Sequence, residues 1–319
     1  MRIRKRHVIS FAISIILLVL LFYKTNFSEV ISAISKADVN YVLFAIICAF
    51  TVLGLRLLRW QILLSSYKLK MRRFDVVSSY LASQFLANLT PARVGDVSRP
   101  YFLKKRYRTS FFRILPAVVV ERFIDAVVLL IISLAFFAFF SFRVSQTFQV
   151  MLLLFSLLLL MILIVILKEN FALRISNYIL KIFGFVKFIN KLKPEIKRKV
   201  GNFYRGLSTI HLTKSFQVLI ITFFCYVFEG AILYFAALAL LGLPISFPFA
   251  VGFVSLAIIG GAISTLPGGL GSLEAILFAL LMLIGFSDSI AFSITILYRF
   301  VSFVIIVSFC SLFFFREAR

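Results

Sequence analysis

Blocks of apolar residues recur along the chain, and most of them are long enough to cross a lipid bilayer. A transmembrane helix needs about 20 consecutive, mostly apolar residues. Two apolar stretches, 75–90 and 247–286, are interrupted by polar residues, Gly or Pro. Six segments qualify as full spans: 7–24, 39–58, 114–141, 148–167, 216–241 and 289–314. The pattern predicts an all-α polytopic membrane protein.

The first apolar block, 7–24, has the shape of a signal peptide. Four basic residues precede it, but no small-x-small cleavage site follows it. We therefore expect an uncleaved first span.

The composition agrees with this pattern and excludes an ordinary soluble enzyme. Of 319 residues, 62% are hydrophobic and only 15% are charged, against about 25% in a typical soluble domain. The net charge is nevertheless +23, and a strongly basic chain usually indicates nucleic-acid binding. With this apolar content, a membrane protein with basic cytoplasmic loops accounts for both numbers, and no nucleic-acid partner is expected.

Residues that bind metals or act as nucleophiles are few. There are three Cys, each in a different apolar block, and two His. Neither a zinc-binding spacing nor a Ser-His-Asp triad follows from them. We therefore expect no catalytic residue, no metal site and no cofactor.

The basic residues are distributed very unevenly between the predicted loops. Of 35 Lys and Arg, 30 fall at the two termini and in segments 56–73, 93–113 and 168–214. The positive-inside rule places all of these in the cytoplasm. We therefore expect a multi-pass protein of a bacterial or archaeal cytoplasmic membrane with both termini inside. Arg122 and Arg299 are the two cations left within spans.

The same rule implies that the two interrupted stretches do not cross the membrane. Segments 56–73 and 93–113 lie on one side, so 75–90 between them should enter the bilayer and return as a re-entrant hairpin. By the same logic, 247–286 forms a second hairpin from the opposite face. Irregular backbone at membrane depth is tolerated only inside protein or beside a wet cavity. The alternative is two short ordinary helices with a different loop topology.

The two interrupted stretches also share a spacing. Pro91 and Pro267 are each followed four residues later by Gly. Arg122 lies 31 positions after Pro91, and Arg299 lies 32 positions after Pro267. The matched spacing indicates an internal repeat.

We therefore expect one membrane domain, 1–319, in which 39–141 and 216–315 are two copies of a unit in opposite orientations. Six full spans and two re-entrant helical hairpins would then form two inverted-topology repeats, an arrangement typical of transporters. Between the copies, 168–215 is basic with recurring apolar residues. It is predicted to be an amphipathic segment lying on the anionic cytoplasmic leaflet.

Several charged residues lie inside the predicted spans, where each costs at least ~2.5–3.5 kcal/mol. Glu121 and Asp125 are four apart and share a helix face. Arg122 lies about 100° around the helix from Glu121, so a pair between these two cannot be assumed. With Glu229 and Arg299, such residues form either structural ion pairs or a polar cavity near the midplane that binds a charged headgroup.

The turns after Pro91 and Pro267 are candidate anion sites. Gly268, Gly269 and Gly271 allow close backbone approach, and a helix starting near Ser272 would point its N–H groups at the turn. Glu274 in its first turn is suited to cap that helix.

In the first copy, Arg93 and Arg99 flank the turn at Gly95 and Asp96. The two arginines either hold a phosphate through their guanidinium forks or anchor the hairpin at the lipid headgroups.

These motifs together resemble a known family, the membrane domain of lysylphosphatidylglycerol synthases, which is shared with stand-alone proteins of the YbhN-like (UPF0104) type. Asp96 stands where that family commonly has Glu. The resemblance covers about residues 10–315 and rests on Leu55-Arg56-Leu57-Leu58-Arg59-Trp60, Pro91-x-Arg93-x-Gly95-Asp96-x-x-Arg99, Glu121-Arg122-x-x-Asp125, Pro267-Gly268-Gly269-Leu270-Gly271-x-x-Glu274 and Arg299.

The resemblance implies a lipid-translocating or lipid-binding membrane domain. In bifunctional relatives a separate soluble domain transfers the amino acid, and this chain is expected to lack it. The lipid itself is not identified. Besides an anionic or lipid-linked headgroup, the partners this interpretation allows are a second copy of the chain or a lipid-synthesising enzyme.

Three hypotheses follow: a lipid flippase, which is favoured, an integral-membrane enzyme using paired carboxylates as acid and base, and a lipid-binding accessory protein that does not transport. For the first, the predicted substrate-binding residues are Arg93, Asp96, Arg99, Glu121, Arg122, Asp125, Glu229, Pro267, Gly268, Gly269, Gly271, Glu274 and Arg299.

Overall fold

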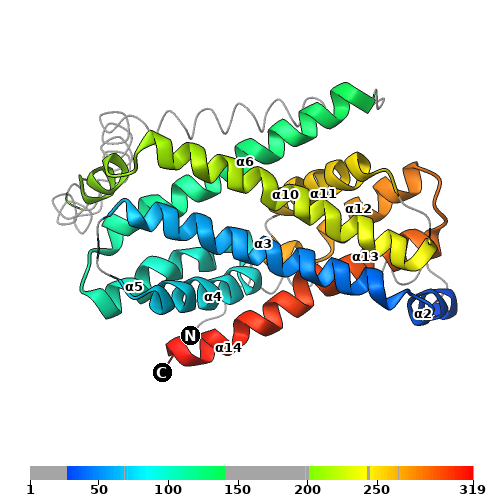
Figure 1. The fold of residues 1–319 in the computed structure, drawn as a ribbon, viewed down its shortest axis with the longest axis horizontal. Helices are drawn as coiled ribbons and strands as arrows, with labels where there is room; N and C mark the ends of the chain where they lie inside the picture. Colours follow the sequence, from blue (N-terminus) through cyan, green and yellow to red (C-terminus); the bar gives the residue numbers. More distant parts are fainter. Residues whose placement is uncertain are drawn as a thin grey trace, which may run out of the picture.

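The computed structural model describes residues 27–67, 69, 71–140, 198, 201–242, 245–264 and 266–318. Within these residues every regular element is helical. Most of the helices lie roughly along one long axis of the molecule (Figure 1). The all-α prediction is confirmed for this part of the chain.

Four helices are long and apolar enough to cross a membrane: α3 (Val39–Ser65), α6 (Phe111–Phe140), α10 (Leu212–Leu241) and the C-terminal span Asp288–Glu317. They coincide with four of the six predicted spans. The other two, 7–24 and 148–167, lie outside the described residues, as does most of the predicted amphipathic segment 168–215.

Helix α3 corrects the predicted end of its span. The prediction ended the span at residue 58 and assigned 56–73 to a cytoplasmic loop, but the helix continues to Ser65. Arg56 and Arg59 therefore belong to the helix, and Arg59 is only 1% exposed. Apolar residues continue on both sides of the two arginines, and carboxylates inside the protein neutralise them, so the helix does not end there.

The first interrupted stretch forms one arm of a hairpin rather than a whole hairpin. Helix α4 (Arg73–Leu89) leads into the 3-10 turn η1 (Pro91–Val97), and α5 (Ser98–Tyr107) returns. The predicted hairpin at 75–90 was therefore too short, because its returning arm lies in the basic segment that had been assigned to a loop. We call α4, η1 and α5 the first hairpin.

The second interrupted stretch folds as two helices joined by a turn. Helix α11 (Phe247–Ile263), the short turn η2 (Pro267–Gly269) and α12 (Ser272–Leu283) make the second hairpin. The first hairpin lies toward one end of the long axis, and the second lies toward the other end (Figure 1). Their tips, η1 and η2, are in contact at the centre of the molecule.

The C-terminal span contacts both hairpins. It consists of α13 (Asp288–Arg299), a π-helical turn η3 (Phe300–Ile305) and α14 (Ile306–Ala318). Helix α14 packs along α4 of the first hairpin. A π turn interrupts the regular hydrogen-bond ladder and is frequent at functional sites, and this one directly follows Arg299.

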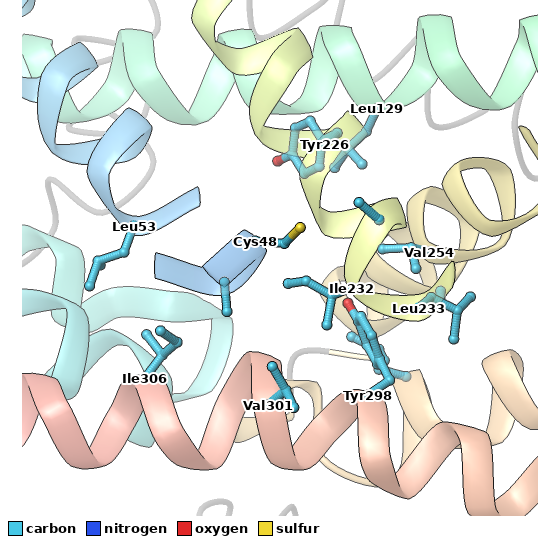
Figure 2. Close-up of a cluster of buried hydrophobic side chains, with 14 of the residues drawn as sticks. Cys48, Leu53, Leu129, Tyr226, Ile232, Leu233, Val254, Tyr298, Val301 and Ile306 are labelled. Carbon is cyan, nitrogen blue, oxygen red and sulfur yellow. The ribbon is translucent and has the colours of Figure 1, made fainter. Parts of the chain in front are cut away.

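An apolar core joins the long helices. Figure 2 shows side chains of α3, α10 and the C-terminal span packed together, including Cys48, Ile232 and Val301. Elsewhere the backbones approach too closely for any side chain. A Cβ added at Gly230 of α10 would lie 2.6 Å from the Cα of Val251 on α11.

This close approach gives a stability prediction. Gly230→Ala should destabilise the protein by about 1–3 kcal/mol, because the overpacked helices must separate. Thermal unfolding of the detergent-purified protein measures the effect. Gly54→Ala is the matched control: it lies within α3 and its Cβ would have nothing within 4 Å, so it should be neutral or slightly stabilising. Equal melting of both variants would contradict the packing of α10 on α11.

Candidate functional site

A cavity of about 300 Å³ lies where the two hairpin tips meet the long helices. Helices α3, α4, α6, α10 and α11, both tips and the C-terminal span contribute to its wall. Much of the wall is apolar, including Ile258, Leu266 and Phe303. The charged residues of the lining are Arg56, Arg93, Arg122, Asp125, Glu229 and Arg299.

Behind the cavity, Glu121 is the centre of a buried ion network. Its carboxylate accepts a hydrogen bond from Nη2 of Arg59 at 2.6 Å and another from Nη1 of Arg99 at 2.7 Å. All three residues are at most 1% exposed. Glu121 thus links α3, α6 and the returning arm of the first hairpin.

The outer members of this network are also paired. Arg59 donates to Asp125 and, at 3.0 Å, to the hydroxyl of Thr222 on α10. Arg99 donates to Asp96 at 2.5 Å. The guanidinium of Arg99 also lies 4.3 Å from the ring centroid of Tyr80, a cation–π contact that stabilises a buried cation.

Arg122 pairs with its neighbour Glu121, which its position on the helix alone did not establish. Its Nη2 donates to Glu121 at 2.8 Å, and its Nη1 lies 3.1 Å from Asp125. The Arg side chain is long enough to cross the helix surface and reach both carboxylates. It also lines the cavity, and its side chain is 31% exposed.

Arg93 lies in the first tip in an unusual conformation. Its φ of 54° is positive, although it is not a glycine, and such a backbone costs of order 1–3 kcal/mol. Its Nη2 donates to Oε1 of Gln84 at 3.1 Å, and Asp96 is 3.6 Å away. The tip is tight, because a Cβ at Gly95 would lie 2.3 Å from the backbone of Leu86.

The second tip is held by Arg299 and Glu274. Arg299 donates to Glu274 at 2.6 Å and to the carbonyl of Gly268 at 3.1 Å. Glu274 in turn accepts from the N–H of Gly271 at 2.8 Å, as the predicted cap requires. Gly268, Gly269 and Gly271 all have positive φ, which explains why glycines occupy this turn.

The remaining ion pair joins α3 and α10. Arg56 donates to Glu229 at 2.7 Å, and the hydroxyl of Tyr298 donates to the other oxygen of Glu229 at 3.3 Å. Tyr298 precedes Arg299 on the C-terminal span. The pair thus connects the cavity wall to the element that holds the second tip.

The structure brings the predicted site residues together, in two layers. Lining the cavity are Arg93, Arg122, Asp125, Glu229, Gly268, Gly269 and Arg299. Supporting them from behind or within the tips are Asp96, Arg99, Glu121, Pro267, Gly271 and Glu274.

Sequence reasoning missed several residues of this site, among them four on α3 and α4. Arg56 and Arg59 had been assigned to a loop, although the unbroken apolar pattern around them indicated a continuing helix. Gln84 and Asn88 of α4 also line the cavity. They are four apart, so they share a helix face. Neutral amides cost less than charges to place in a membrane, so a search for charged residues within the spans did not select them.

The two tips show matching ion pairs. The arginine 31 residues after Pro91 approaches the acid of its own tip, with Nε of Arg122 3.5 Å from Asp96. The arginine 32 residues after Pro267 does the same, with Nε of Arg299 2.6 Å from Glu274. Each tip is therefore anchored to a long helix by an arginine at an equivalent distance along the chain.

The charges at this centre do not cancel. Six arginines face five carboxylates, which leaves one positive charge; among the cavity-lining residues the count is four against two. The described part of the chain holds no group of three or more His, Cys, Asp or Glu placed to bind a metal. The arrangement is therefore suited to an anion.

Removing one buried arginine should expose how strongly the network depends on it. Arg59→Met leaves Glu121 and Asp125 short of a partner and should destabilise the protein by about 3–5 kcal/mol. The control is Arg106→Met, which removes pairs to Asp75 and Glu317 from a side chain that is 41% exposed and should cost clearly less, about 1 kcal/mol. Thermal unfolding in detergent compares them. Similar losses of stability in the two variants would show that the buried network contributes no more than an exposed ion pair.

The sequence is similar to a family of known membrane proteins. A family described as the lysylphosphatidylglycerol synthase TM region matches residues 7–310. A UPF0104 membrane protein of Methanocaldococcus jannaschii is 32% identical over 240 residues, covering 74% of this chain and 95% of that protein. A UPF0104 membrane protein of Pyrococcus horikoshii is 26% identical over 314 residues, covering 91% of each. The chain is thus a member of the lysylphosphatidylglycerol synthase TM region family of membrane proteins.

Proposed function

We propose that this protein is a lipid transporter that moves a phospholipid or a lipid-linked headgroup between the leaflets of the membrane. The observation that carries the proposal is the cavity between the hairpin tips, whose lining holds four arginines against two carboxylates. A cationic cavity inside a membrane protein needs a reason, because buried charge is costly. An anionic headgroup supplies one.

The charge balance favours a phosphate. A phosphodiester carries one negative charge, which equals the single positive charge in excess at the centre. Guanidinium groups bind phosphate oxygens through two parallel hydrogen bonds. Arg93 and Arg122 are placed for this, since each side chain is about one-third exposed and both line the cavity.

The apolar part of the lining suits the rest of a lipid. Ile259, Ala262 and Leu273 of the second hairpin and Ile306 of the C-terminal span face the same cavity as the arginines. A headgroup could enter beside them while the acyl chains remain in the bilayer. No part of the lipid would then place a charge in hydrocarbon.

The topology of the proposal is six full spans and two re-entrant hairpins in two inverted repeats, 39–141 and 216–315. Helices α4 and α11 have 17 residues each, about 26 Å at 1.5 Å per residue, which is short for a full crossing. Their hairpins open at opposite ends of the molecule (Figure 1). The first would open to the cytoplasm and the second to the outside, with both termini cytoplasmic.

Transport would follow from movement of one repeat against the other. In transporters with inverted repeats, rocking about a central site exposes that site to each side in turn. The tips in contact here, η1 and η2, would be the elements whose separation changes. The matched anchoring pairs of Arg122 and Arg299 support two equivalent halves.

Loss of the lining arginines should slow transport. After reconstitution into vesicles, Arg93→Ala and Arg122→Ala should each reduce leaflet exchange of fluorescent phosphatidylglycerol roughly tenfold or more, because a charge-assisted hydrogen bond is lost. Arg93 is the cleaner variant, because Gln84 is the one residue among those described that accepts a hydrogen bond from its side chain.

Lys105→Ala is the matched control, since it removes an exposed cation of α5 and should leave exchange unchanged. Melting temperatures establish that the variants are folded. Wild-type exchange no faster than in empty vesicles, or equal exchange by wild type and both arginine variants, would refute the proposed function.

A further inference from the structure

We infer that the cavity selects a phosphodiester headgroup esterified to a small, neutral, hydroxyl-bearing alcohol such as glycerol or inositol, and discriminates against headgroups that carry an amine. This inference rests on the proposed lipid-binding role of the cavity. It concerns which class of headgroup the lining recognises, and three features of the lining carry it.

The first feature is that every carboxylate near the cavity already has an arginine partner. Glu229 pairs with Arg56, and Asp125 pairs with Arg59 and Arg122. Behind them, the same is true of Asp96, Glu121 and Glu274. An ammonium group would have to displace a guanidinium to find a negative partner, and an unpaired buried charge is strongly unfavourable.

The second feature is a pair of amides on α4. Gln84 and Asn88 both line the cavity, and Gln84 is only 2% exposed. The side-chain oxygen of Gln84 accepts from Arg93, but its NH2 group donates to no described residue. The side-chain amide of Asn88 likewise has no hydrogen-bond partner within the described chain. These groups are therefore available to a ligand.

Hydroxyl groups from α10 and the C-terminal span extend this neutral polar surface. Tyr226 of α10, Tyr298 of the C-terminal span and Ser302 of η3 all line it. Amides and hydroxyls offer both donors and acceptors. An alcohol needs both, whereas an ammonium group only donates. The neutral polar lining therefore matches a polyol better than an amine.

The third feature is the position of the amides relative to the phosphate. Arg93, proposed to bind phosphate, is hydrogen-bonded directly to Gln84 at 3.1 Å. The nearest hydroxyl of such an alcohol, on the second carbon from the phosphate ester oxygen, would thus lie near the amides. The cavity of about 300 Å³ is at the lower end of ligand pockets, about 300–1,000 Å³, so it suits one small headgroup rather than a long oligosaccharide.

The test compares lipids that share acyl chains and differ only in the headgroup. Phosphatidylglycerol and phosphatidylmethanol have the same phosphodiester charge, but the second has no hydroxyl. Exchange by the reconstituted protein should be roughly five- to tenfold faster for phosphatidylglycerol, as expected from one or two hydrogen bonds. It should also exceed exchange of phosphatidylethanolamine and lysylphosphatidylglycerol by a similar factor.

Variants then assign the preference to α4. Gln84→Leu and Asn88→Leu should each reduce the ratio between exchange of phosphatidylglycerol and exchange of phosphatidylmethanol toward one. Asn88 is less buried than Gln84, so its variant serves if Gln84→Leu does not fold. Gln61→Leu is the matched control, because Gln61 lies on α3 outside the lining, and it should keep the wild-type ratio.

Binding is measured separately from transport through thermal stabilisation in detergent by the same lipids and by water-soluble glycerophosphoglycerol. Selective stabilisation by phosphatidylglycerol without any exchange would overturn the proposed transport but uphold the headgroup class. Exchange that is equal for phosphatidylglycerol and phosphatidylmethanol, or faster for the amine-bearing lipids, would overturn the inference alone. Stabilisation by glycerophosphoglycerol as strong as by the lipid would show that the acyl chains add nothing to binding, which contradicts a lipid as the ligand but upholds the headgroup class.

Discussion

The two hydrogen bonds that Glu121 accepts, from Arg59 and Arg99, organise the centre of this protein. A carboxylate and two guanidinium groups that are almost completely buried are unfavourable separately and tolerable only together. Because they come from α6, α3 and the first hairpin, their pairing determines how these elements meet. Asp96, Asp125 and Arg122 extend the same pairing toward the cavity. The buried network therefore fixes the positions of the charged side chains that line the cavity.

The hairpin tips depend on this network in a second way. Each tip contains backbone that no ordinary helix has: Arg93 and three glycines of the second tip adopt positive φ. Irregular backbone inside a membrane protein needs internal partners, and the arginines supply them through Asp96, Glu274 and the carbonyl of Gly268. The arginines therefore have two roles, since they hold the tips in place and leave an excess of positive charge beside the cavity.

Sequence patterns predicted the helical class, four spans within the described residues, the interruption of the apolar stretch at Pro267 and the grouping of the charged residues. The same patterns misplaced Arg56, Arg59 and Arg99, because a count of charges treats any arginine outside the most apolar windows as a loop residue. Whether an arginine lies in a loop or in the interior depends on a carboxylate that is distant in sequence, such as Glu229 for Arg56. Gln84 and Asn88 could not be selected, because only the fold places α4 beside the cavity.

The central claim is that the arginine-lined cavity between the hairpin tips holds a phosphodiester headgroup. An electron cryomicroscopy structure of the protein in nanodiscs containing phosphatidylglycerol tests it most directly. We expect phosphate density within hydrogen-bond distance of Arg93 and Arg122, with the glycerol hydroxyls beside Gln84 and Asn88. Well-resolved side chains around a cavity without lipid density, and lipid bound only at the outer surface of the helices, would contradict it.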